Sequence, residues 1–178
     1  AILGIINDEY LSSFEQTKRM DPPTLQSAVD AGEQQIEYEI GADENEDGKI
    51  RLSWGRVIGT YAEREKLTAM QIMSDVLTEN NQAPLTKAML ENELAETMRL
   101  YTIDGVANPW VKIEARNVKK ENCKQVEKRI FDTLNALANG GLDHEKLEAS
   151  MANLEFQMRE RDYGSYPQGL ILGMQVFD

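Results

Sequence analysis

The chain has 178 residues and a formal net charge of −12, with 41% hydrophobic and 28% charged residues. This composition is ordinary for a soluble globular domain, and the negative charge argues against nucleic acid or an anionic membrane as a partner. We find no apolar run of transmembrane length and no signal peptide, and the single Cys123 cannot form an internal disulfide. We therefore expect a reducing compartment, the cytoplasm.

The first segment predicts a helix that ends at a proline pair. Residues 2–16 place apolar side chains at nearly helical spacing. Asp21-Pro22-Pro23 cannot continue this helix, because proline lacks the amide hydrogen and disfavours a helical preceding residue. Both ends of the chain are apolar, which predicts a segment cut from a longer polypeptide. We expect these apolar ends, including residues 170–177, to pack on each other, on the sheet or on a second copy.

The acidic stretch DENEDGKIRLSW (43–54) begins like an EF-hand calcium loop. An EF-hand needs flanking helices and a bidentate glutamate at its twelfth position, which is Trp54 here. Residues 36–40 and 50–54 instead alternate apolar and polar side chains, so both flanks are predicted as strands. The pattern therefore favours a hairpin in which Gly48 supplies a positive φ, with a calcium-dependent interaction module as an alternative.

Helices and strands alternate along the remaining residues. Thr60 and Glu63 form a capping box before one helix, and Pro84 suits the first turn of the next. Residues 97–105 and 110–118 are predicted strands, the second with one wet face. Three helices follow, the first stopped by residues 139–141, the second capped by Asp143 and the third starting near Pro167. This order predicts an α+β fold with an antiparallel or mixed sheet and helices packed on one face.

A search for chemistry finds no catalytic, cofactor-binding or metal-ligating residues in this segment. The single histidine, His144, precedes Glu145 and Glu148, but a zinc enzyme needs three protein ligands, so a solvated helix start is favoured. Cys123 lies in an apolar stripe without a neighbouring base. The chain also has no phosphate loop, dinucleotide fingerprint or nucleophile elbow.

Four methionines and one tryptophan are predicted to contribute mainly to packing within the protein. Met70, Met73, Met151 and Met158 are predicted to fill gaps in the core rather than to form a binding face. Trp110 is expected in the core or on the sheet, or lining a surface groove after Asn108-Pro109.

The stretch NLEFQMRERDYGSYPQGLILGM (153–174) resembles the end of the second domain of presequence-protease-type peptidases, in the pitrilysin/insulinase superfamily of zinc metallopeptidases. The positions that carry this motif, expected to be structural, are Glu155, Phe156, Arg159, Glu160, Gly164, Ser165, Tyr166, Pro167, Gly169 and Leu170. Residues 2–15, 47–59, 80–91 and 108–118 are similar to other parts of that family, in the same order along the chain.

The resemblance implies a protein of four homologous domains in two halves that close around a chamber. Zinc would bind the first domain, on a His-x-x-Glu-His helix that this chain lacks. Residues 1–20 would then be the last helix of that preceding domain and residues 21–35 a linker. Residues 36–178 would form a non-catalytic α+β domain of the LuxS/mitochondrial-processing-peptidase-like fold, truncated at its C-terminal end.

The role implied by this resemblance is structural. The domain would form part of the chamber wall and contact other domains of an enzyme that degrades oligopeptides or presequences. Its partners would be those domains and the peptide substrate, without nucleic acid or membrane. An acidic-surface or calcium-dependent interaction module, and a non-catalytic subunit of a split peptidase, remain alternatives.

Overall fold

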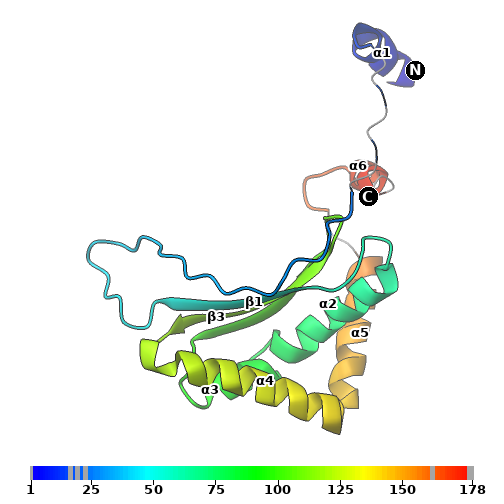
Figure 1. The fold of residues 1–178 in the computed structure, drawn as a ribbon. Coiled ribbons are helices and arrows are strands. Elements are labelled where there is room, and N and C mark those ends of the chain that lie inside the picture. The colour runs from blue at the N-terminus through cyan, green and yellow to red at the C-terminus, as the bar shows by residue number, and fades with distance from the viewer. Residues whose placement is uncertain (1, 16–17, 19–20, 22–23, 161–162, 176–178) are drawn as a thin grey trace.

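The helices and strands of the chain form an α+β structure with one sheet (Figure 1). The structure, a computed structural model, describes residues 2–15, 18, 21, 24–160 and 163–175. The elements are α1 (Ile2–Glu9), β1 (Ile50–Val57), α2 (Arg64–Thr78), α3 (Pro84–Leu90), β2 (Thr97–Ile103), β3 (Trp110–Val118), α4 (Cys123–Gly140), α5 (His144–Arg159) and α6 (Gln168–Gln175), with short 3-10 turns at Leu11–Ser13 and Lys120–Asn122.

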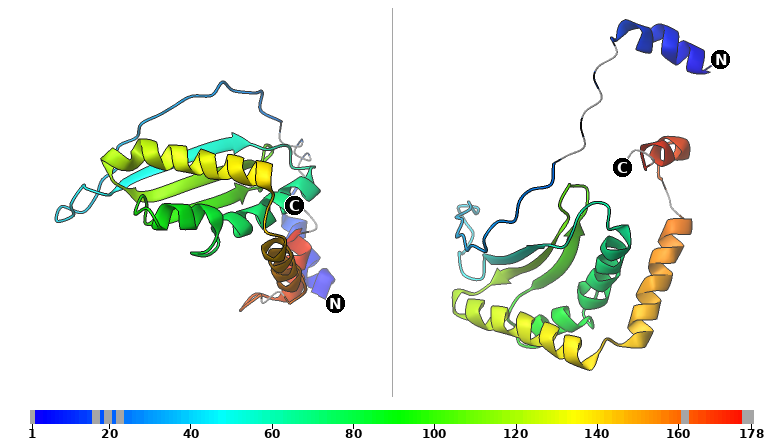
Figure 2. Two further views of the ribbon diagram at one scale, coloured as in Figure 1. Left: turned by 90° about the horizontal axis from the view of Figure 1, so that it is seen from below. Right: turned by 45° about the vertical axis from the view of Figure 1, so that its right-hand side comes forward.

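The sheet is antiparallel, with β3 in the centre and the order β1-β3-β2. Ile113 in the central strand lies opposite Trp54 on one side and Leu100 on the other. Helices α2, α3 and α4 cover one face of this sheet (Figures 1 and 2). The predicted fold class is therefore confirmed, with three antiparallel strands in the described residues.

The core lies between the sheet and these helices. Alternate residues of the strands point into it, and α4 adds Val126 and Ile130, which are fully buried. Trp54 closes one end of the core by an edge-to-face contact with Phe131, at 6.2 Å between ring centres. The buried residues of the core cluster are Leu77, Leu85, Met89, Leu94, Ala95, Met98, Leu100, Ala115, Val118, Val126 and Ile130.

Thr78, at the end of α2, joins three elements through short polar contacts. Its hydroxyl accepts a hydrogen bond from the Leu100 amide of β2 at 3.1 Å. Its carbonyl accepts one from the Thr86 hydroxyl of α3, also at 3.1 Å. Since Leu100 belongs to an edge strand, this contact satisfies a backbone donor that the sheet leaves free.

Two helix ends follow the predicted signals, and a third does not. Asp143 caps α5, because its side chain accepts from the amides of Glu145 and Lys146. Gly141 ends α4 with a φ of +83°, a conformation that favours glycine. Before α2, the Thr60 amide donates to the Glu63 carboxylate at 2.7 Å, and this contact lowers the pKa of Glu63. Because α2 begins only at Arg64, with Glu63 as its N-cap, this contact lies in the turn before the helix, and the predicted capping box with Thr60 as N-cap is wrong.

The predicted strand at residues 36–40 is wrong. These residues form no ladder and run as irregular chain beside β1 (Figures 1 and 2). The Tyr38 hydroxyl donates to the Lys49 carbonyl, and the Arg51 guanidinium lies 4.7 Å from the centre of the Tyr38 ring. Side chains, rather than paired backbone groups, therefore join this segment to β1.

The acidic loop is a turn, as predicted, but it joins irregular chain to a strand rather than two strands. Gly48 has a φ of +70°, and Asn45 accepts a hydrogen bond from the Asp47 amide at 3.0 Å. Because β1 begins at Ile50, the loop has no helix after it and does not have EF-hand architecture.

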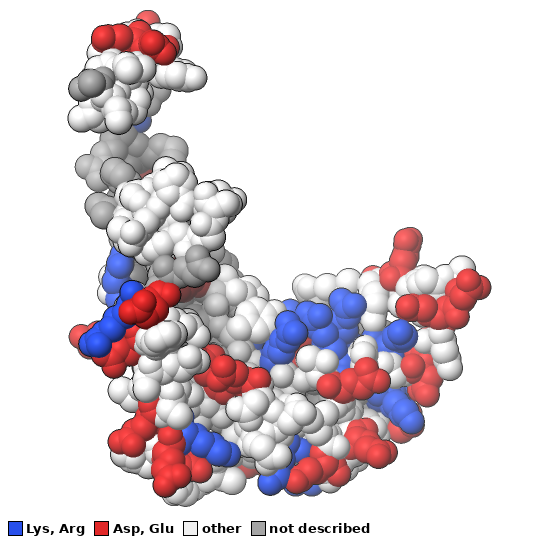
Figure 3. Space-filling view, turned by 180° about the vertical axis from the view of Figure 1, so that it is seen from behind, with Lys and Arg blue, Asp and Glu red and all other residues white. Residues whose placement is uncertain are grey.

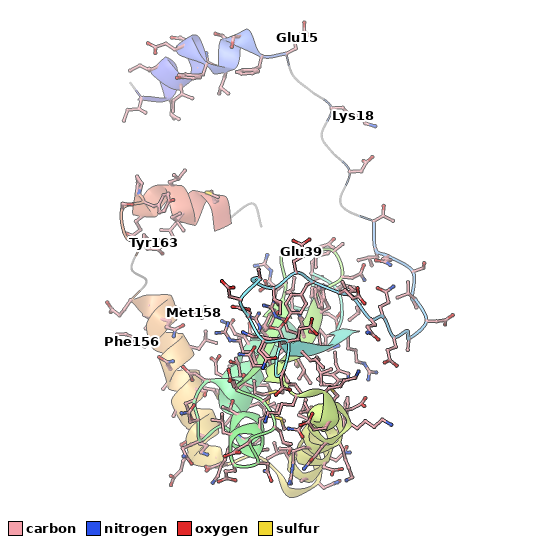
Figure 4. All side chains as sticks on the ribbon, turned by 90° about the vertical axis from the view of Figure 1, so that its left-hand side faces the viewer. Glu15, Lys18, Glu39, Phe156, Met158 and Tyr163 are labelled. Atoms are coloured by element: carbon pink, nitrogen blue, oxygen red, sulfur yellow. The ribbon has the colours of Figure 1, made fainter. Side chains whose placement is uncertain are left out.

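Helices α1 and α6 lie apart from the sheet and its covering helices (Figures 1 and 4). The predicted first helix is shorter than expected, and apolar residues on both helices are exposed, including Ile2 at 74% and Leu170 at 54%. In the residues described, the expectation that these ends pack on each other or on the sheet is therefore wrong. The part of that expectation at residues 176 and 177 lies outside the described residues, and packing on a second copy stays a prediction.

Candidate functional site on the open face of the sheet

One face of the sheet is not covered by helices, and we call it the open face. It is formed by alternate residues of all three strands, which the register places side by side, except that Arg51 lies at an irregularity between Ile50 and Leu52. These residues are Arg51, Ser53, Gly55 and Val57 of β1, Thr97, Arg99, Tyr101 and Ile103 of β2, and Trp110, Lys112, Glu114 and Arg116 of β3. The wet face predicted for β3 is thus the middle row of a wider polar surface.

Glu114 is the centre of this face and is only 5% exposed. The Lys112 amine lies 2.9 Å and the Arg116 guanidinium 2.7 Å from its two carboxylate oxygens. Burial acts to raise the pKa of Glu114, but the hydrogen bonds from the two cations and their charges together lower it. The hydrogen bond to Glu114 in turn raises the pKa of Lys112. One buried carboxylate therefore holds two cations in place and neutralises only one of their charges.

Two further cations of the open face have no carboxylate partner. Arg99 lies opposite Glu114 in the register, is exposed, and has no hydrogen-bond or ion-pair partner within the described part of the chain. Arg51 contacts the Tyr38 ring. Figure 3 shows basic side chains gathered over the sheet, with acidic side chains around them. The open face is thus locally cationic in a chain whose net charge is −12.

Aromatic side chains lie beside these charges. The Trp110 ring covers Gly55, since a β-carbon at that glycine would lie 3.4 Å from the indole. The Lys112 amine lies 5.8 Å from the centre of the Tyr101 ring. Trp110 is therefore on the sheet, as one of the sequence-based alternatives stated. Cationic and aromatic groups on a flat surface can bind a ligand, but this set contains no nucleophile paired with a base.

A second hollow, the α5 groove, runs between α2 and α5 and has a volume of about 560 Å³. It is lined by Ile72, Glu148, Met151, Ala152, Leu154, Glu155, Met158 and Arg159. Met151 and Met158 are more than half exposed, so the prediction that they fill the core is wrong. They line the groove between α2 and α5 instead of the core, and Figure 4 shows Met158 on α5.

The structure splits the predicted family-motif residues between two places. On α5, Arg159 forms an ion pair with Glu155 at 2.5 Å beside the groove, whereas Phe156 is 64% exposed (Figure 4). Glu160 ends this helix. The other positions, Gly164, Ser165, Pro167 and Gly169, belong to the turn after it and to α6, and Gly164 has a φ of +57°. The motif residues thus lie at a helix end, in a turn and on α6 rather than in one cluster of side chains, and their structural role stays a prediction.

Elsewhere in the described residues, the side chains that could act in catalysis or bind a metal ion do not form a cluster. His144 is exposed in the first turn of α5 and lies 3.4 Å from Glu148. Burial raises the pKa of the Cys123 thiol, which is unfavourable for a nucleophile. Burial, with the nearby Glu79, raises the pKa of Asp75 on α2. Across the described ranges, no three His, Cys, Asp or Glu side chains are placed to hold a metal ion.

Sequence reasoning missed most of the open face. Alternation in β3 identified Lys112, Glu114 and Arg116 as a wet row, but gave no reason to join them with Arg99 or Arg51. Single exposed arginines on a strand carry no local signal of a site, because the grouping arises only when the three strands pair.

Comparisons with known proteins identify relatives of the chain. It is 32% identical, over 178 residues, to Protein HypA of Clostridium perfringens, covering 99% of this chain and 18% of that protein. It is 40% identical, over 94 residues, to Presequence protease 1, chloroplastic/mitochondrial, of Arabidopsis thaliana, covering 52% of this chain and 9% of that protein. The chain thus spans less than a fifth of the length of either relative. No protein-family model matches it.

The fold also has a solved counterpart. The chain superimposes with a TM-score of 0.62 on a crystal structure described as the "Inactive Peptidase Domain of a Putative Zinc Protease" from Bordetella parapertussis. The two are 12% identical in sequence, and the match covers 76% of this chain and 73% of that one. No helix in the described parts of the chain is long and apolar enough to span a bilayer.

Proposed function

We propose that the chain is a segment of a zinc peptidase of the pitrilysin/insulinase type and serves as its non-catalytic second domain. The observation that carries this proposal is the shared fold with an inactive peptidase domain, together with sequence similarity along nearly the whole chain. The parent protein would be a zinc-dependent endopeptidase that degrades oligopeptides or presequences. Zinc would bind a catalytic domain outside this segment.

The proposed division of the chain follows the family resemblance. Residues 1–20 would be the last helix of the preceding domain, residues 21–35 a linker, and residues 36–178 would belong to the non-catalytic domain. The position of α1 away from the sheet supports this division (Figure 1). So does the absence of ladder pairing from residues 24–40, within the described part of the chain.

We assign the two free surfaces of the domain to different tasks. The open face would form part of the chamber wall, because it is polar and lies away from the helices. The α5 groove would contact another domain, since Met151 and Met158 expose apolar surface in it. The exposed apolar residues of α6 extend this second surface. The proposed compartment is the cytoplasm, supported by the unpaired Cys123.

The first experiment tests whether zinc binding and peptide cleavage belong to a domain other than this one. We expect the 178-residue chain, dialysed against buffer, to hold no stoichiometric zinc and to cleave no fluorogenic peptide. The natural longer protein should hold one zinc ion per chain and cleave the same peptide. Tightly bound zinc with turnover in the 178-residue chain would contradict the non-catalytic assignment.

A second experiment tests the contact surface in that longer protein. Replacing Met151 and Met158, which line the groove, with Asp should loosen the packing of this domain on its neighbour, detected as faster limited proteolysis between domains. Ala136→Asp, an exposed position on α4, is the matched control and should leave the proteolysis rate unchanged. Equal sensitivity of both variants would argue against the α5 groove as an interface.

A further inference from the structure

We propose that the open face binds acidic stretches of a peptide in extended conformation, with carboxylates of the peptide held by Arg99, Arg51 and the Lys112–Arg116 pair. If the proposed function is right, these peptides would be acidic oligopeptide substrates rather than presequences, which contain few acidic residues. The binding itself depends only on the surface described above.

The charge of the surface supports an acidic ligand. Four cationic side chains of the open face are accompanied by one carboxylate, that of Glu114. Lys112 and Arg116 share this carboxylate, and Arg99 and Arg51 pair with no carboxylate among the residues that the structure describes. The open face thus carries a surplus of positive charge, although the chain as a whole has a net charge of −12. The surplus is therefore available to a ligand.

The geometry of the surface fits an extended chain. Neighbouring strands lie about 4.8 Å apart, so the rows of cations on β1, β3 and β2 together span about 10 Å. Alternate side chains of an extended peptide lie on the same side, about 7 Å apart. Acidic residues at every second position can therefore reach two rows at once, while the residues between them point away.

The positions of the cations are fixed before a ligand arrives. Glu114 holds Lys112 and Arg116 by two hydrogen bonds, so the entropy of ordering these side chains is already lost in the free protein. Trp110 and Tyr101 provide an apolar shelf beside them. The surface should thus prefer peptides that combine acidic residues with an aromatic or aliphatic neighbour.

The surroundings of the open face argue against nucleic acid as the ligand. Acidic side chains surround the basic group (Figure 3). A long polyanion that crossed this rim would meet repulsion on both sides, whereas a short acidic stretch fits inside it.

The test measures binding of a labelled Glu-rich peptide, with Glu at alternate positions, to the 178-residue chain by fluorescence anisotropy. A Lys-rich peptide of the same length and a single-stranded oligonucleotide serve as competing ligands. We expect the Glu-rich peptide to bind more tightly than either, with an affinity that falls as salt is added.

Variants locate the site. Arg99→Gln should weaken binding about two- to fivefold, the effect of one partly solvated charge pair. The double variant with Arg51→Gln should weaken it further by a similar factor. Lys124→Gln removes an exposed, unpaired cation from α4 and should leave the affinity unchanged. Arg99→Lys, which keeps the charge, should retain most of the binding.

Three results would overturn the proposal. They are equal losses in Arg99→Gln and Lys124→Gln, tighter binding of the Lys-rich peptide, and tighter binding of the oligonucleotide. Circular dichroism of each variant shows whether a loss is one of folding. Because the assay needs neither zinc nor turnover, a negative result would leave the proposed peptidase domain untouched, and missing zinc in the longer protein would leave peptide binding intact.

Discussion

The two faces of the sheet use the same three strands for opposite purposes. The covered face contributes residues such as Leu100 and Ala115 to a dry core. The open face, one residue further along each strand, carries four cations and a buried carboxylate. A shift of one residue in register would exchange them, so the core residues fix the placement of the charged rows. The packing of core residues on the covered face therefore sets the positions of the charged side chains on the open face.

The largest effect is expected on the covered face. Ile130→Ala removes a fully buried side chain of α4 and should lower the free energy of unfolding by about 2–5 kcal/mol. Urea denaturation followed by circular dichroism measures it. The exposed Ala138→Gly on the same helix is a control for helix propensity alone, about 1 kcal/mol. A loss at Ile130 no larger than this control would mean that α4 is not packed on the sheet.

A smaller loss should come from the charged centre of the open face. Glu114→Gln leaves Lys112 and Arg116 without their carboxylate in a nearly buried position and should cost about 1–3 kcal/mol. The exposed Glu121→Gln should change stability by less than about 0.5 kcal/mol. If both variants unfold at the same urea concentration, the triad contributes no stability.

The same carboxylate should make stability depend on acid pH. The folded state lowers the pKa of Glu114 from its ordinary value of 4.5, so its contribution is complete above that value. It is lost as the pH falls through the lower pKa of the folded state, because the protonated side chain no longer attracts the two cations. Thermal unfolding from pH 6 to pH 3 should therefore bring the wild type and Glu114→Gln closer together. A constant difference would contradict this origin.

A gain in stability is expected from one residue of β2. The Thr102 hydroxyl is buried without a hydrogen-bond partner in the described structure. Thr102→Val keeps the shape and removes the unsatisfied group, which should add about 1 kcal/mol to the free energy of unfolding. Thr86→Val, whose hydroxyl donates to Thr78, should instead lose stability. The two substitutions are compared by urea midpoints, and a loss in both would show that Thr102 has a partner.

The smallest effect concerns the surface away from the sheet. Phe156→Ser should change the stability of the 178-residue chain by less than about 0.5 kcal/mol, because the ring is 64% exposed. Thermal unfolding measures this. A destabilisation of several kcal/mol would mean that the ring already has a partner within the chain.

Much of the fold could be predicted because its elements have long, regular patterns. The helix from Cys123 combines an apolar stripe with a glycine stop, and Asp143 caps the next helix as expected. Residues 36–40 alternate as clearly as β1, yet form no strand. Alternation reports that two sides of a segment differ in polarity, but not whether its backbone has a partner.

The candidate site could be predicted only in part. The wet row of β3 was visible because Lys112, Glu114 and Arg116 alternate with apolar residues in one segment. Arg99 and Arg51 join it through strand pairing across the chain, which a local pattern does not contain. Exposure of Met158 was missed for a related reason, since a helical apolar stripe does not reveal whether anything packs on it.

The central position of β3 has a consequence for the order in which the chain folds. β2 and β3 are joined by a short loop, so their hairpin can form from contacts that are local in sequence. β1 reaches β3 only after the chain containing α2 and α3 has closed into a loop, which carries a larger entropic cost. We therefore expect β1 to dock late, with the β2–β3 hairpin and its helices forming the earlier nucleus. Mutations in β1 should then speed unfolding more than they slow refolding.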